Sequence, residues 1–65
     1  MRVTVNDEAV EVQEQMTVAD LLEKLGFQQK GIAVAVDWTV IPRSQWHTAL
    51  TEGAKVEVVA AVQGG

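Results

Sequence analysis

Cysteine is absent from this 65-residue chain, so neither a disulfide nor a thiolate metal site can stabilise the fold. The single histidine, His47, has no second histidine or cysteine to complete a metal site, and we expect it to be a surface residue. The sequence contains no paired carboxylates, no nucleophile set beside a base and no metal cluster of the kind that indicates an enzyme. The chain must therefore fold on its apolar residues, which make up 48% of it.

Long apolar stretches and an excess of basic residues are also absent. The first residues alternate polar and apolar types, which is unlike a signal peptide or a membrane span. Nine acidic residues against five basic residues give a net charge of −4, which disfavours binding to nucleic acid. We therefore expect one small cytoplasmic domain, without a nucleic-acid or membrane partner, whose acidity suits docking on basic protein surfaces.

Alternating apolar and polar residues predict several strands, of which the first two are joined by turn residues Asn6 and Asp7. A second turn is expected at Asp37 and Trp38, and Pro42 ends the short strand that follows it. A single helical turn is expected near residues 44–47. The predicted strands cover residues 2–6, 9–12, 32–36, 39–41 and 55–62.

One helix is predicted over residues 18–25. Thr17 and Asp20 have the spacing of a capping box at its start, and Gly26 is the expected stop at its end. The residues at helical spacing on one face are Val18, Leu21, Leu22 and Leu25. Because these leucines and the inward valines of the strands must share one core, we expect an α+β fold, a mixed sheet of about five strands with the helix across one face.

The last predicted strand carries apolar residues on both faces. Val56 and Val58 are expected to face the core, whereas Val59 and Ala61 point to the opposite face beside Glu57. An uncovered apolar patch next to the end of the chain is a candidate docking site for a partner protein.

The two tryptophans receive different interpretations. Trp46 follows Pro42 in a segment that is expected to fold back on the sheet, where packing is the favoured role. Trp38 lies in a turn and is either a partner contact or a cover over a strand edge. Arg43 is expected to pair with a partner's acidic group or with a carboxylate such as Asp37.

Gly64 and Gly65 follow the predicted domain of residues 1–62, and residues 63–65 are expected to form a flexible tail. Glycine has no Cβ, so two in succession can pass through a narrow active-site channel. A carboxylate at the end of such a tail is a poor electrophile until adenylation supplies a leaving group. A sulfur nucleophile can then displace AMP and leave a thiocarboxylate, a sulfur carrier that needs no cysteine.

Five features of the sequence occur together: its length, the element order, the helix start at 17–22, the Pro-Arg-Ser-Gln-Trp segment at 42–46 and the ending at 58–65. On these features the chain resembles the ThiS family of sulfur carriers in thiamine thiazole synthesis. The resemblance implies a ubiquitin-like β-grasp fold and a protein co-substrate rather than an enzyme. Gly65 would carry the sulfur, and Gly64 would provide clearance.

The resemblance also implies the partners. An E1-like adenylating enzyme of the ThiF type would use ATP on Gly65, so the carrier needs no cofactor of its own. Sulfur would come from a cysteine desulfurase or another donor, and a ThiG-like thiazole synthase would accept it.

Three alternatives stay open from the residues. The same carrier chemistry could supply molybdopterin or cysteine synthesis, because the tail does not specify the acceptor. Gly65 could instead form an isopeptide bond in a protein modifier, or the domain could be an interaction module with an incidental tail.

Overall fold

The computed structural model describes residues 1–60, and its element order confirms the predicted α+β arrangement. The division between residues 62 and 63 lies outside this range. The elements are β1 (Arg2–Val5), β2 (Glu8–Glu11), α1 (Val18–Leu25), β3 (Ile32–Val36), β4 (Thr39–Val40), the 3-10 helix η1 (Arg43–Gln45) and β5 (Lys55–Ala60).

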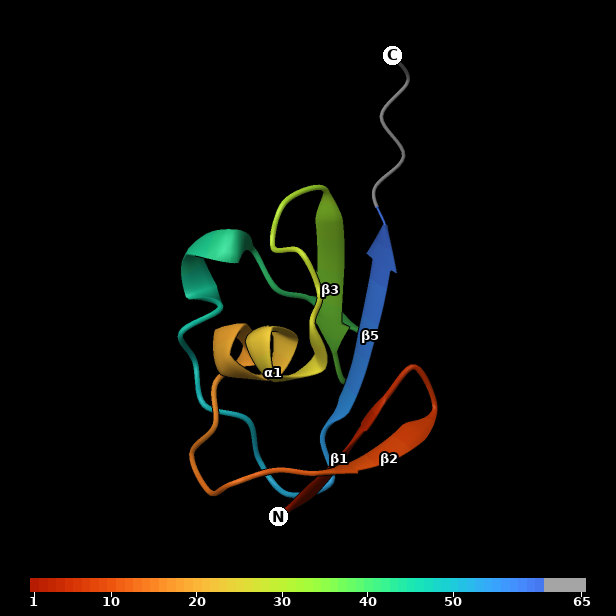
Figure 1. Ribbon diagram of the computed structural model, residues 1–65, viewed down its shortest axis with the longest axis vertical. Coiled ribbons are helices and arrows are strands. Elements are labelled where there is room, and N and C mark those ends of the chain that lie inside the picture. The colour runs from red at the N-terminus through yellow and green to blue at the C-terminus, as the bar shows by residue number, and fades with distance from the viewer. Residues whose placement is uncertain (61–65) are drawn as a thin grey trace.

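The five strands form one mixed sheet in the order β2-β1-β5-β3-β4. β1 and β5 run parallel, with Val5 opposite Val56, and the other neighbouring strands are antiparallel. Helix α1 lies across one face of this sheet, and the chain reaches the end of β5 at the pole opposite the N-terminus (Figure 1). The last strand in sequence is thus the central strand in space.

Helix α1 begins and ends at the predicted residues. The Thr17 hydroxyl accepts a hydrogen bond from the Asp20 N–H at 3.1 Å, and the Asp20 carboxylate accepts one from the Thr17 N–H at 3.3 Å. Gly26 follows the helix with φ +82°, a left-handed conformation that glycine adopts without steric cost. The helix is therefore defined at both ends by local interactions.

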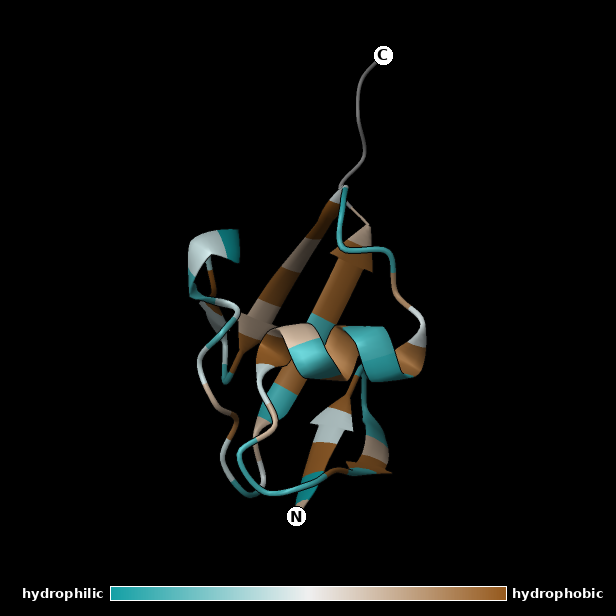
Figure 2. Ribbon diagram, turned by 60° about the vertical axis from the view of Figure 1, so that its left-hand side comes forward, coloured by the Kyte–Doolittle hydropathy of each residue, from teal (hydrophilic) through white to brown (hydrophobic). Residues whose placement is uncertain are grey.

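The core lies between α1 and the sheet. Figure 2 shows the hydrophobic strands β3 and β5 behind the helix, whose outward surface carries hydrophilic residues. Among residues 1–60, the buried apolar residues of the core are Val3, Val5, Val12, Val18, Leu21, Leu22, Val34, Trp46, Leu50, Ala54, Val56 and Val58. Leu50 and Ala54 come from the segment between η1 and β5 and had not been predicted as core.

The prediction that Leu25 belongs to the core is wrong. Its side chain is 38% exposed, because it is the last residue of α1 and the chain turns away at Gly26. Phe27 packs against the core in its place, and its N–H donates to the Leu22 carbonyl oxygen at 2.9 Å. Helical spacing placed Leu25 on the correct face but did not show that the rest of the domain leaves the last residue of the helix partly uncovered.

Trp46 packs inside the domain, as predicted. The indole is 4% exposed, and its Nε1–H donates to the Ile41 carbonyl oxygen at 3.0 Å. The Trp46 carbonyl oxygen accepts from the N–H of Ala19 at 3.0 Å, and the Thr48 carbonyl oxygen accepts from the N–H of Val18. The segment after η1 therefore satisfies backbone donors in the first turn of α1 that the helix itself leaves without partners.

Within residues 1–60, no helix is long and apolar enough to cross a membrane.

Candidate functional site on the outer face of the sheet

The face of the sheet that α1 does not cover carries the candidate docking residue. Along β5, Val56 and Val58 are buried against the helix, whereas Val59 is 60% exposed. Because side chains alternate along a strand, Lys55, Glu57 and Val59 share the outer face. The predicted orientation of Val59 is thus confirmed, while Ala61 lies outside the described residues.

Small residues make this outer face hollow. Ala33 lies opposite Val59 and Ala35 opposite both Glu57 and Val40, so two alanines form the floor between larger neighbours. The hollow measures about 290 Å³. Its lining residues are Asn6, Ala33, Val34, Ala35, Val40, Glu57 and Val59. The lining is mostly apolar, with the Asn6 amide and the Glu57 carboxylate as its polar groups, and it suits an apolar side chain of a partner protein.

Asn6 connects the edge of this hollow to the central strand. Its side-chain amide donates to the Val58 carbonyl oxygen at 3.2 Å and accepts from the Val58 N–H at 2.9 Å. Asn6 has φ +50°, a conformation that asparagine tolerates better than most residues. The sequence identified Asn6 only as a turn residue, because its partner is 52 positions away.

A second hollow, of about 130 Å³, lies between the start of α1 and the segment after η1. Its lining residues are Val18, Val36, Ile41, Gln45, Thr48, Ala49, Leu50 and Thr51. None of these side chains titrates near neutral pH, so the second hollow offers no group for acid–base chemistry.

At the start of β5, Lys55 joins the two predicted turns. Its Nζ lies 3.0 Å from Asp7 Oδ1, and its backbone N–H donates to Asp37 Oδ1 at 3.0 Å. The hydrogen bond and charge of Asp7, with a contribution from Glu57, raise the pKa of Lys55 above its ordinary value. Lys55 is therefore a cation fixed among carboxylates.

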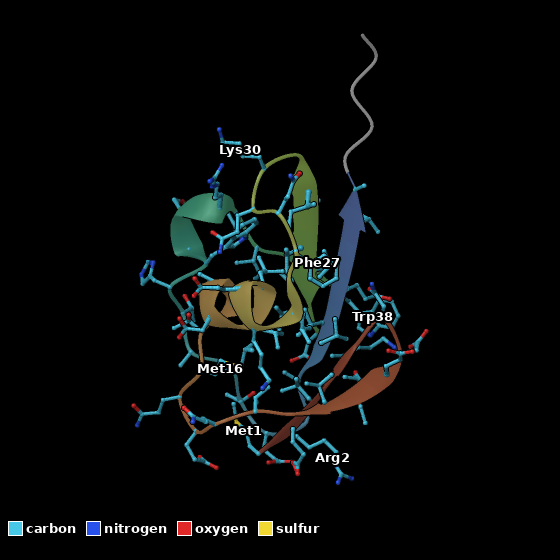
Figure 3. All side chains as sticks on the ribbon, viewed as in Figure 1. Met1, Arg2, Met16, Phe27, Lys30 and Trp38 are labelled. Atoms are coloured by element: carbon cyan, nitrogen blue, oxygen red, sulfur yellow. The ribbon has the colours of Figure 1, made fainter. Side chains whose placement is uncertain are left out.

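Trp38 lies over this lysine. The Lys55 Nζ is 5.0 Å from the centroid of the Trp38 ring, and the tryptophan is 75% exposed. Figure 3 shows Trp38 beside the tip of the β1–β2 hairpin.

Arg43 contacts an aromatic ring. Its guanidinium lies 5.9 Å from the Trp46 ring centroid, and no ion pair to Asp37 is found within residues 1–60.

His47 is exposed, as expected. No group of three potential metal ligands occurs in the described part of the chain. Gly64 and Gly65 lie outside that part.

A comparison of the sequence with models of protein families shows which family the chain belongs to. The ThiS family model matches residues 1–65. The chain belongs to the ThiS family. It is similar to the sulfur carrier protein ThiS of Escherichia coli (strain K12), with 32% identity over 66 residues and full coverage of both chains. This ThiS-family chain is a sulfur carrier of thiamine biosynthesis, and a small carrier protein rather than an enzyme.

A second relative places the same kind of domain in a longer chain. A thiazole synthase of Paramagnetospirillum magneticum (strain ATCC 700264 / AMB-1) is 33% identical over 66 residues. The match covers the whole ThiS-family chain but 20% of that thiazole synthase.

Solved structures agree with this assignment. The crystal structure of the thiamine biosynthesis protein ThiS from Geobacter metallireducens has a TM-score of 0.86 and 29% identity, with full coverage of both chains. A solution structure of a thiamine biosynthesis protein from the same organism has a TM-score of 0.76, covering the whole chain and 88% of that protein. The ubiquitin-like β-grasp fold is thereby confirmed.

Proposed function

We propose that this ThiS-family protein carries sulfur as a thiocarboxylate on the carboxyl group of Gly65. In the first step, an E1-like enzyme joins the carboxylate to AMP from ATP and releases pyrophosphate. In the second step, sulfide displaces AMP and leaves the thiocarboxylate; the sulfide comes from a donor, or from the persulfide of a desulfurase after reduction by a thiol that is oxidised to a disulfide. The carrier contributes the reacting carboxyl group, Gly64 provides clearance, and the ATP is consumed by the partner enzyme. A cytoplasmic location belongs to the same proposal.

The observation that carries this proposal is the match to the family over residues 1–65, which includes both glycines. The similarity to the sulfur carrier of Escherichia coli supports it, because that relative is covered from end to end. Two consecutive glycines are suited to an active-site channel in which a side chain would block entry.

The acceptor in this proposal is a thiazole synthase. Support comes from the thiazole synthase of Paramagnetospirillum magneticum, in which a segment of the same length as this chain is joined to a larger protein. Two activities joined in one polypeptide work at a high effective concentration, which favours a functional contact between them.

The outer hollow with Val59 is the proposed docking surface for these partners. Val59 lies one residue before the end of the described chain, so a partner held here is close to the segment that leads to Gly65. The alanine floor at Ala33 and Ala35 allows an apolar side chain to approach the sheet closely. Ala61 is proposed to extend the same surface.

The test is the intact mass of the protein after incubation with its host's E1-like enzyme, ATP and sulfide. We expect an increase equal to the exchange of one oxygen for one sulfur, located at Gly65 by fragmentation. A chain that ends at Gly64 is the matched control, and it should unfold at the same urea concentration without gaining sulfur. An unchanged mass, with an enzyme shown to load another carrier, would reject the proposal.

A further inference from the structure

The most exposed large apolar side chain of the described domain lies at a strained backbone position. Trp38 is 75% exposed, and it occupies the two-residue turn between β3 and β4 with φ +72°. A left-handed φ is unfavourable for a bulky residue, and glycine or asparagine would fit the turn better. Because the exposed indole is not buried within the domain, packing there does not offset the unfavourable backbone conformation. A tryptophan at this position is therefore better explained by a contact outside the domain.

The indole lies against a charged neighbour that is itself paired. Lys55 Nζ lies 5.0 Å from the ring centroid, and the same ammonium is paired with Asp7 Oδ1 at 3.0 Å. Asp37 accepts the Lys55 backbone N–H, which ties the turn to the first residue of β5. A positioned aromatic side chain loses little conformational entropy when a partner covers it, which favours a binding contact.

The charges around Trp38 indicate the chemistry of that partner. Three carboxylates, those of Asp7, Asp37 and Glu57, surround Lys55, and we call these four residues together with Trp38 the corner. Three negative charges against one positive charge give the corner a net charge of −2. A guanidinium stacks on an indole and can donate to a carboxylate at the same time, which an ammonium group does less well. The corner therefore fits an arginine on a basic protein surface.

The corner is continuous with the outer hollow. Val40, two residues after Trp38, is 69% exposed and lines that hollow opposite Ala35. The start of β5 at Lys55 and its end at Ala60 are about 17 Å apart at roughly 3.3 Å per residue. A contact at Trp38 can thus orient the domain without reaching the end of β5.

We propose that Trp38, with Asp7 and Asp37, docks an arginine of the thiazole synthase and forms a second contact beyond the outer hollow. This assignment rests on the proposed function, because that function names the thiazole synthase as acceptor. The relative in which a similar domain is part of a thiazole synthase favours this enzyme over the adenylating enzyme.

The experiment compares the binding of purified host thiazole synthase to three variants. Trp38→Gly removes the ring and suits the left-handed turn, so it should fold at least as well as the wild type. Gln15→Gly is the matched control, since Gln15 is exposed with φ +65° in the segment between β2 and α1. Trp38→Phe retains an aromatic face at the same backbone position.

We expect Trp38→Gly to weaken binding by about 10-fold or more, Gln15→Gly to bind like the wild type, and Trp38→Phe to lie between them. Binding should weaken as salt is added, because the contact is charged. Acrylamide quenching of tryptophan fluorescence should fall in the complex. The buried Trp46 is quenched little, and the Trp38→Phe complex supplies the signal of the synthase's own tryptophans, so the difference between the two complexes reports on Trp38.

Loading of the wild type with sulfur separates the two proposals. If the wild type is loaded and binds the synthase but Trp38→Gly binds equally well, the docking proposal is overturned and the carrier function stands. If Trp38→Gly instead impairs loading by the adenylating enzyme and leaves synthase binding unchanged, the assignment of the partner is overturned. A wild type that is never loaded would reject the carrier function itself.

Discussion

The side-chain amide of Asn6 pairs with both backbone groups of Val58, at 2.9 and 3.2 Å. β1 is paired with β5 through Val5 opposite Val56, and the chain then turns away at Asn6. The amide therefore continues the contact between β1 and β5 to Val58, two residues beyond Val56 on the central strand. This places the turn between β1 and β2 at the edge of the outer hollow.

Replacing Asn6 by glycine should destabilise the domain by about 1–2 kcal/mol, because two hydrogen bonds to the central strand are lost. Glycine keeps the left-handed turn, so the loss reports on the amide alone. Urea unfolding measures it, and amide exchange at Val58 should become faster. Asn6→Asp should also be destabilising, since a carboxylate oxygen would face the Val58 carbonyl. Unfolding of Asn6→Gly at the wild-type urea concentration would contradict the role of the pair.

Replacing Thr17 by alanine should cost about 1 kcal/mol, because the Asp20 N–H loses its hydroxyl acceptor. Thr17→Ser retains an oxygen at that position and should remain within a few tenths of a kcal/mol of the wild type. Thermal unfolding followed by circular dichroism compares the two variants. Equal midpoints for Thr17→Ala and Thr17→Ser would show that the capping box does not stabilise the helix.

The two tryptophans form a matched pair for a packing test. Trp46→Ala should cost about 3–5 kcal/mol and largely unfold so small a domain, because the buried ring and its hydrogen bond to Ile41 are both lost. The exposed Trp38→Ala should change stability by no more than about 1 kcal/mol. Circular dichroism in urea measures both variants without relying on tryptophan fluorescence. Similar losses in the two would contradict the burial of Trp46.

Replacing Val59 by aspartate should leave the fold largely intact, with a cost of up to about 1 kcal/mol for a poorer strand residue. Partner docking should nevertheless weaken by about 10-fold, since a charge would stand on the apolar hollow. Binding to the adenylating enzyme and to the thiazole synthase is measured separately. Gln13→Asp adds the same charge at an exposed site between β2 and α1 and should bind normally. Unchanged binding of Val59→Asp to both enzymes would remove the hollow from the docking surface.

Much of the fold was predictable because its signals are local. The helix start at Thr17 and Asp20 and its end at Gly26 depend on residues within a few positions of each other, so the sequence alone specifies them. The outward orientation of Val59 follows from strand alternation in the same way. Membership of the ThiS family was likewise readable from short segments spread along the whole chain.

The tertiary structure decided what depends on residues that are distant in sequence. The parallel pairing of β1 with β5, the Asn6 amide on Val58 and the position of Trp38 over Lys55 each join segments that are 17 to 52 residues apart. The exposure of Leu25 belongs here too, because helical spacing gives a face but not the extent of the surface that covers it. Local sequence therefore determines which elements form, whereas packing between distant elements determines which side chains remain available to a partner.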